Sequence, residues 1–159
     1  GLLDAAPVRA YGAGGKARDF VGDCWDHFSV IFDFPNQVLA TFNSIQVGFG
    51  FDDIVCRVYG TKGTADLHYF SKSVIKCKEY SNAAEPGNLY TPGAGANIAT
   101  FHENVINRAY ANATVAPSVR SNLTTILGRT AAYQNRVVTW DEMLRNGERF
   151  EADLRGLKT

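Results

Sequence analysis

The chain has 159 residues, enough for one domain with a sizeable core, and its 45% apolar and 20% charged residues are ordinary for a globular protein. Its 16 basic and 16 acidic side chains cancel, so electrostatics do not favour nucleic acid or an anionic membrane surface as a partner. No apolar run approaches the roughly 20 residues that span a bilayer. The start, Gly1-Leu2-Leu3-Asp4, lacks Met and signal-peptide features, which we interpret as a cut within a longer chain, with a cytoplasmic location favoured over export.

A glycine-rich stretch follows the first apolar run. Gly12 to Ala17 fits G-x-G-x-x-[G/A], the dinucleotide-binding pattern, and Asp33 stands where a ribose-binding acid is expected. A parallel crossover needs about a dozen residues, and the next strand begins too soon for one. That strand also alternates, whereas a strand buried on both faces is almost continuously apolar. We therefore expect Gly12 to Gly15 to form a flexible turn between antiparallel strands, with no cofactor-binding residue in this chain.

Strand patterns dominate the first half of the chain. Residues 27–34 alternate between apolar and polar, and Pro35-Asn36 separates them from a second strand over 38–47, which predicts a hairpin. A loop over 48–53 follows, and then come strands over 54–59 and 64–69, joined by a tight turn at 60–63, and a fifth over 73–80. This spacing predicts an antiparallel meander.

Helical patterns dominate the second half. Residues 82–96 are rich in Ala, Gly, Pro and Asn and predict a long loop, followed by a helix from Asn97 to near Asn112. A second helix should begin with Ser118 as its N-cap, and Gly128 within it suggests close approach of another backbone. A capping box at residues 139–142 starts a brief third helix, which should end near Gly147, before a charged tail that frays.

Strands followed by helices indicate the α+β class. We expect an open, largely antiparallel sheet of about five to seven strands with two main helices packed on one face. The other sheet face needs cover, and a second copy of the chain is the partner expected there.

Few side chains suggest chemistry. Trp25 could offer an aromatic wall to a sugar ring and His27 a hydrogen bond, although alternation alone would place His27 on a solvent-facing strand surface. We expect His68 to be exposed, and His102 flanks the apolar stripe of the first helix. No acid–base pair or metal-ligand spacing appears, so we predict no catalytic or metal site within the chain. The three cysteines have no C-x-x-C spacing and should be buried, reduced thiols: Cys24, Cys56 and Cys77.

Three ordered segments resemble a known family. They are WDHFSVIFDFPNQVLATFNSIQ (25–46), VYGTKGTADLHY (58–69) and SNLTTILGRTAAYQNRVVTWDEM (121–143), and they are similar to the C-terminal domain of the Gfo/Idh/MocA oxidoreductases. That family includes the relatives of glucose–fructose oxidoreductase and inositol dehydrogenase. The resemblance covers about residues 7–144.

The resemblance implies NAD- or NADP-dependent hydride transfer to or from a sugar or polyol. In the family, an N-terminal Rossmann domain binds the nucleotide, and the catalytic lysine and the Asp/His pair lie upstream of the matched part, so none is carried over. The whole chain, 1–159, would be one C-terminal substrate and oligomerisation domain, inactive alone. Its partners would be its own missing Rossmann domain and a second copy bound through the sheet face. Trp25, His27 and Gln46 are the candidate substrate-side residues. The family's frequent Glu-His on the first helix is here Glu103-Asn104.

Two alternatives remain open at this stage. One is a stand-alone interaction or scaffold module that keeps the sheet without catalysis. The other is a small α+β enzyme with its own pocket between the sheet and the helices. An upstream nucleotide-binding domain in the same reading frame would favour the oxidoreductase.

Overall fold

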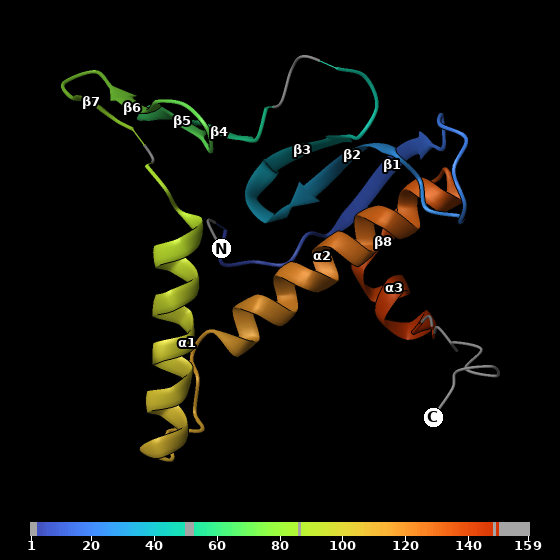
Figure 1. The fold of residues 1–159 in the computed structure, drawn as a ribbon. Helices are drawn as coiled ribbons and strands as arrows, with labels where there is room; N and C mark the ends of the chain where they lie inside the picture. The colour runs from blue at the N-terminus through green and yellow to red at the C-terminus, as the bar shows by residue number, and fades with distance from the viewer. Residues whose placement is uncertain (1–2, 50–52, 86, 148, 150–159) are drawn as a thin grey trace. The chain divides into compact units, whose positions relative to one another are not determined.

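The computed structural model describes residues 3–49, 53–85, 87–147 and 149 (Figure 1). The chain divides into two units: Gly1–Gly48 with Ala113–Thr159, and Phe49–Asn112. Each unit contains its own four-stranded antiparallel sheet. The α+β class is therefore confirmed. The expected single sheet is instead two sheets, and the two expected main helices are divided between the units.

The first unit is built on the predicted hairpin. Its sheet has the order β3-β2-β1-β8, formed by Val38–Ile45, His27–Phe34, Arg9–Gly15 and Val138–Thr139. A short 3-10 turn, Pro35–Gln37, joins β2 to β3, as the Pro-Asn break predicted. The edge strand β8 brings the C-terminal part of the unit back beside β1.

The core of the first unit lies between this sheet and helix α2, Val115–Gln134, which crosses one face of the strands (Figure 1). The shorter helix α3, Trp140–Asn146, packs beside β8 and α2. The buried apolar residues come from both layers: Ala10, Val30, Phe32, Leu127, Ala131, Ala132, Val138 and Met143. The strand alternation of β2 thus predicted its buried face correctly.

The glycines of the dinucleotide-like pattern lie within β1, and the expected turn there is wrong. Gly12 pairs with Val30 and Gly15 with His27 across an antiparallel ladder. A Cβ atom on Gly12 would lie 2.9 Å from Val30 Cγ2, and one on Gly14 would lie 2.2 Å from the His27 carbonyl oxygen. Glycine is needed here because the neighbouring strand β2 approaches β1 closely at these positions. The antiparallel pairing agrees with the conclusion that this is not a βαβ nucleotide loop.

Gly128 in α2 also allows close packing, in this case of the helix against the sheet. A Cβ atom there would lie 2.6 Å from Phe32 Cζ and 3.3 Å from Val30 Cγ1. The sheet does approach Gly128, as expected, but with side chains rather than with its backbone. The helix propensity lost at Gly128 is offset by closer packing against β2.

The second unit is the predicted meander. Its strands have the order β4-β5-β6-β7 and are formed by Val55–Gly60, Gly63–His68, Ser73–Cys77 and Ser81–Ala84. The tight turn between β4 and β5 is present, with Gly60 paired to Gly63. The predicted loop over 48–53 includes residues 50–52, which lie outside the described residues.

The predicted long loop over 82–96 is wrong. It contains most of β7 and the start of helix α1, Tyr90–Ile106. The Asn88 side-chain oxygen accepts hydrogen bonds from the backbone N–H groups of Tyr90 at 3.1 Å and Thr91 at 3.4 Å. Pro92 is tolerated because its missing N–H falls in the first turn, where backbone donors have no helical partner.

Helix α1 also differs from the prediction in its face and its end. Ile98 and Phe101 of the predicted apolar stripe are each 70% exposed, and no described residue of the helix is buried. The helix ends at Ile106, and Arg108 beyond it takes a left-handed conformation with φ of 52°. Helix α2 begins at Val115 without a side-chain cap, so Ser118 is not its N-cap.

The capping box of α3 is half present. Thr139 Oγ1 accepts the backbone N–H of Glu142 at 3.2 Å, as predicted. The Glu142 carboxylate does not return to the cap but pairs with Arg136, with Nη2 and Oε1 2.5 Å apart. The helix ends at Asn146, and Gly147 after it takes a left-handed conformation with φ of 44°. The charged tail beyond it, at residues 148 and 150–159, lies outside the described residues.

The cysteines are free thiols, but the expected burial is wrong. All three are exposed: Cys24, Cys56 and Cys77. Cys24 lies in the connection between β1 and β2, and the other two lie in the second unit, where none of the described residues is buried. A sequence pattern typical of a strand therefore did not mean that one face of the strand is buried. No helix in the described ranges is both long and apolar enough to cross a membrane.

Candidate functional site

The face of the first sheet opposite α2 carries a hollow near the end of β1. The register places Ala13, Ser29 and Asn43 in one row across the three strands, and Gly15, His27 and Ile45 in the next. These rows line a hollow of about 560 Å³, together with neighbours such as Ala17. Small residues on β1 leave this space empty, while β2 and β3 supply its polar groups.

Asp26, directly before β2, is the buried charged group beneath the hollow. Its side chain is only 1% exposed, and it accepts backbone N–H bonds from Ala17 at 3.0 Å and Arg18 at 2.8 Å. Its backbone continues the ladder, because its N–H donates to Gly15 and its carbonyl accepts from Gln46. Asp26 therefore holds the connection over residues 16–26 against the end of the sheet.

The hydrogen bonds to Asp26 also determine its ionisation. The Ala17 N–H lowers the pKa of the Asp26 carboxyl well below its usual range, burial opposes this, and the Arg18 N–H and His27 lower the pKa further. A carboxylate that accepts several backbone N–H bonds stays ionised, because these donors stabilise only the charged form. Asp26 is thus a permanent acceptor at neutral pH.

His27 connects Asp26 to the hollow. Its Nδ1 lies 2.9 Å from Asp26 Oδ1, and the side chain is 41% exposed. A Cβ atom on Gly15 would lie 3.3 Å from His27 Cε1 and 3.4 Å from Nε2, so glycine at this position leaves that edge of the ring uncovered. His27 is on the solvent side of the strand, as alternation indicated, but it is held by a buried carboxylate.

The other two candidate residues lie at the same end of the sheet but not beside the His27 ring. The Trp25 ring packs edge-on against Tyr133, with centroids 4.4 Å apart, and also contacts Phe28 at 5.5 Å. Gln46 is exposed and reaches Asp26 through its backbone N–H, at 2.8 Å. Asp26 itself was not singled out from the sequence, and its position directly before an alternating strand was the only available signal.

A second pair of polar residues completes the hollow. The Ser29 hydroxyl donates to the Asn43 side-chain carbonyl at 2.8 Å across the two strands. This leaves the Asn43 amide group as a donor and a Ser29 oxygen lone pair as an acceptor. The hollow can therefore both donate and accept hydrogen bonds, beside the apolar Ile45 side chain.

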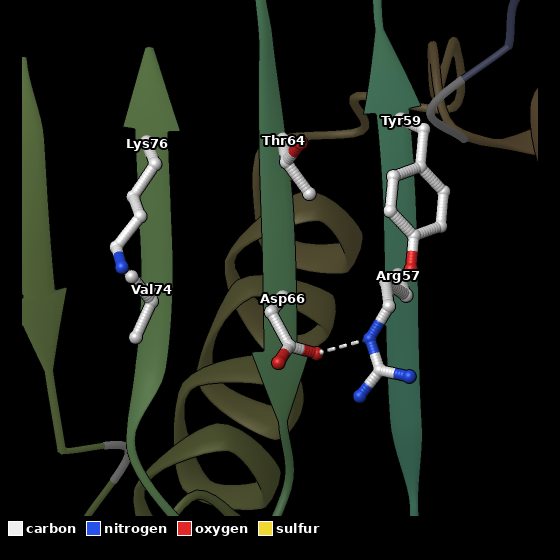
Figure 2. Close-up of a pocket in the computed structure, with 6 residues that line it drawn as sticks. All are labelled: Arg57, Tyr59, Thr64, Asp66, Val74 and Lys76. Carbon is white, nitrogen blue, oxygen red and sulfur yellow. Dashed lines mark hydrogen bonds and ion pairs between the residues drawn. The ribbon is translucent and has the colours of Figure 1, made fainter.

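The second unit has a smaller hollow of about 300 Å³ over its sheet (Figure 2). Arg57 Nε lies 2.9 Å from Asp66 Oδ1, and Thr64 and Lys76 stand on the neighbouring positions. The Arg57 hydrogen bond lowers the pKa of the Asp66 carboxyl, and burial opposes it. Because the central charges neutralise one another in an exposed setting, this is a surface ion pair and a weaker candidate than the hollow at His27.

His68 belongs to this second network, and the expectation that it is exposed is wrong. Its side chain is 22% exposed, with Nδ1 3.5 Å from Asp53 Oδ1 and Nε2 3.3 Å from Asp66 Oδ1. No local sequence pattern indicates this pairing, because Asp53 reaches His68 only once β4 and β5 are paired. In the described ranges no three His, Cys, Asp or Glu side chains are grouped to hold a metal ion.

Comparisons with known proteins place the fold. No protein-family model and no curated protein matches the sequence. Solved structures do match. One is an oxidoreductase from Agrobacterium radiobacter, determined in complex with NAD+, L-tartaric acid and magnesium, with a TM-score of 0.68 and 12% identity over 87% of this chain and 44% of that chain.

Two further structures agree with the first. An NAD-binding protein from Listeria innocua matches with a TM-score of 0.54 and 20% identity over 87% of this chain and 42% of that one. A protein from Thermotoga maritima, described as a proposed oxidoreductase, matches with a TM-score of 0.59 and 16% identity over 85% of this chain and 41% of that one. The chain thus has the fold of part of these proteins and spans less than half of their length, which supports the resemblance noted from the sequence.

Proposed function

We propose that this chain is the C-terminal domain of an NAD(P)-dependent oxidoreductase that acts on a sugar or polyol. The observation that supports this is the fold match to 44% of an oxidoreductase solved with NAD+, over 87% of the present chain. In this proposal a Rossmann domain outside the chain binds the nucleotide. The antiparallel β1–β2 pairing supports that division, because the glycine pattern of β1 does not open a helix that could receive a pyrophosphate.

The domain would contribute one wall of the substrate pocket. His27 lies on the outer face at one end of the first sheet, Gln46 is joined to Asp26 there by its backbone N–H, and Trp25 packs on the α2 face of the same end, so the three would line the end of the sheet rather than one of its faces. An aromatic ring, an imidazole and an amide are groups suited to a hydroxylated substrate, since they combine apolar contact with hydrogen bonding. Hydride transfer itself would depend on residues of the other domain, and this chain alone would be inactive.

The domain would also form an oligomer through the outer face of its first sheet. Tyr11, Ile31 and Leu39 are exposed on this face, in the rows farthest from the His27 hollow. Apolar side chains gathered on an open sheet face favour association, and a two-fold copy of the same face is the simplest partner.

The test is nucleotide binding by the product of the complete reading frame that encodes this chain. We expect saturable changes in NADH or NADPH fluorescence on titration with that product, and none with the 159-residue chain at the same concentration. If the complete product binds neither nucleotide, the oxidoreductase proposal is wrong and the scaffold module takes its place.

A further inference from the structure

We propose that Asp26 is a positioning residue, which holds His27 in the Nδ1–H tautomer and so makes Nε2 a hydrogen-bond acceptor for the hydroxyl group of an uncharged ligand in the outer-face hollow. The inference rests on the proposed function, because it takes His27 as a substrate-side residue. It adds that Asp26 determines which nitrogen of His27 is protonated, and that the ligand is uncharged.

The tautomer follows from the surroundings of Asp26. Its oxygens accept from Ala17 and Arg18, and Oδ1 lies 2.9 Å from His27 Nδ1. An ionised carboxylate has no hydrogen to donate, so the hydrogen of this bond must sit on Nδ1. In a neutral imidazole the other nitrogen then carries a lone pair. The tautomer of a histidine is determined by the hydrogen bond that one ring nitrogen makes, often to a carboxylate or a backbone carbonyl.

The hollow is open at the acceptor. Gly15 pairs with His27 in the sheet. A Cβ atom at Gly15 would lie 3.4 Å from His27 Nε2, so the absence of a side chain there leaves this edge of the ring uncovered. Ser29 and Asn43 lie one row away and supply a further acceptor and donor. A molecule with several hydroxyl groups can therefore donate to His27 and exchange hydrogen bonds with the Ser29–Asn43 pair.

The charge of the ligand follows from what lines the hollow. Among the described residues its lining contains no Lys, Arg, Asp or Glu side chain. The lining offers an anion no cation in exchange for its hydration, because the Arg18 guanidinium lies outside it and is already paired with Asp26, with Nε 3.6 Å from Oδ2. The arrangement favours an uncharged polyol over a carboxylate or phosphate.

The test measures the tautomer of His27 and compares the binding of two matched ligands. 15N NMR of the full chain, recorded at a pH where the ring is neutral, should show His27 with Nδ1 protonated and Nε2 unprotonated. D-glucitol should shift the His27 ring signals saturably. D-gluconate, which replaces one terminal hydroxymethyl group by a carboxylate, should bind at least about tenfold more weakly.

Three variants separate positioning from folding. Asp26→Asn should leave His27 as a mixture of tautomers, because an amide cannot accept all the donors that Asp26 accepts. Gly15→Ala keeps Asp26 and His27 but places a methyl group against the ring edge, and it should weaken D-glucitol binding at least about tenfold with the tautomer unchanged. His102→Gln, at an exposed position of α1, is the control and should change neither measurement.

The outcomes are distinct. An unchanged tautomer in Asp26→Asn would overturn the positioning role. If that variant does not fold, protonated Nε2 in the wild-type chain would overturn it. Failure of D-glucitol to bind, equal binding of D-gluconate, or unaltered binding in Gly15→Ala would overturn the ligand assignment. None of these results depends on nucleotide binding by the complete product, so this inference and the proposed function can fail separately.

Discussion

At the scale of single residues, Asp26 is the most consequential side chain. Its buried carboxylate accepts from the amides of Ala17 and Arg18 and lies against His27 Nδ1, while its backbone N–H and carbonyl join the end of β2 to Gly15 and Gln46. Its partners come from a connection of irregular backbone. Local sequence patterns therefore predicted the strand that follows Asp26 but not the interactions of Asp26 itself.

Asp26→Asn should destabilise the chain in a pH-dependent way. The folded-state pKa is depressed below the ordinary aspartate value of about 3.9, so Asp26 contributes its stability above that pH and loses it as the pH falls toward the folded-state value. The difference in urea midpoint between wild type and variant should therefore be largest at neutral pH and shrink below about pH 4.

Asp19→Asn provides the matched control, because Asp19 is exposed in the same connection. Its urea midpoint should stay close to that of the wild type at every pH. A midpoint difference for Asp26→Asn that does not vary between about pH 7 and pH 3 would show that ionisation of Asp26 is not what stabilises the fold.

At the scale of elements, glycine determines how closely α2 approaches the first sheet. A Cβ atom on Gly128 of α2 would lie 2.6 Å from Phe32 Cζ, and one on Gly12 of β1 would lie 3.3 Å from the Ala132 Cβ atom of α2. A pattern of apolar residues predicts a helix and a strand separately. It does not report the distance between them, which is why the glycines of β1 suggested a turn or a nucleotide loop.

Gly128→Ala should lower the free energy of unfolding by about 1–3 kcal/mol, because the overpacking against Phe32 outweighs the gain of about 1 kcal/mol in helix propensity. Urea unfolding followed by circular dichroism measures this. Gly95→Ala in α1 is the matched control, since a Cβ atom there meets nothing within 4 Å, and it should be neutral or stabilising by up to about 1 kcal/mol. A stabilised Gly128→Ala would mean that the helix is not held against the sheet as described.

The ends of helices were predicted correctly where a capping or turn residue within a few positions marks them. Thr139 caps α3 and Gly147 ends it, both through contacts within a few residues. The start of α1 was missed because Pro92, Gly93 and Gly95 resemble a loop in composition. Asn88 and the tolerance of a first turn for proline outweigh that composition.

At the scale of the whole molecule, the outer face of the first sheet has two different ends. Tyr11, Ile31 and Leu39 form an exposed apolar group beside the Arg9–Asp33 ion pair, and the hollow at His27 lies in the opposite rows. This division allows one face to carry both the proposed oligomer contact and the proposed ligand site.

Ile31→Lys should weaken self-association of the complete protein, because a charge would be buried at the centre of the proposed contact. Size-exclusion chromatography with light scattering should show a shift to a smaller species at equal concentration. Val119→Lys, an exposed apolar position on α2, is the control and should leave the mass unchanged. A complete protein that is strictly monomeric before mutation would refute the sheet-face interface.

The sequence by itself determined the α+β class, the antiparallel hairpin and meander, the face of β2 that is buried and the location of the third helix. These depend on period, turn residues and caps, which act over a few positions. Only the tertiary structure decided that there are two sheets, that the glycines of β1 lie in a strand, and that Asp26 and His27 form a pair over an open hollow. Those features depend on which segments approach one another and how closely, and local periodicity does not carry that information.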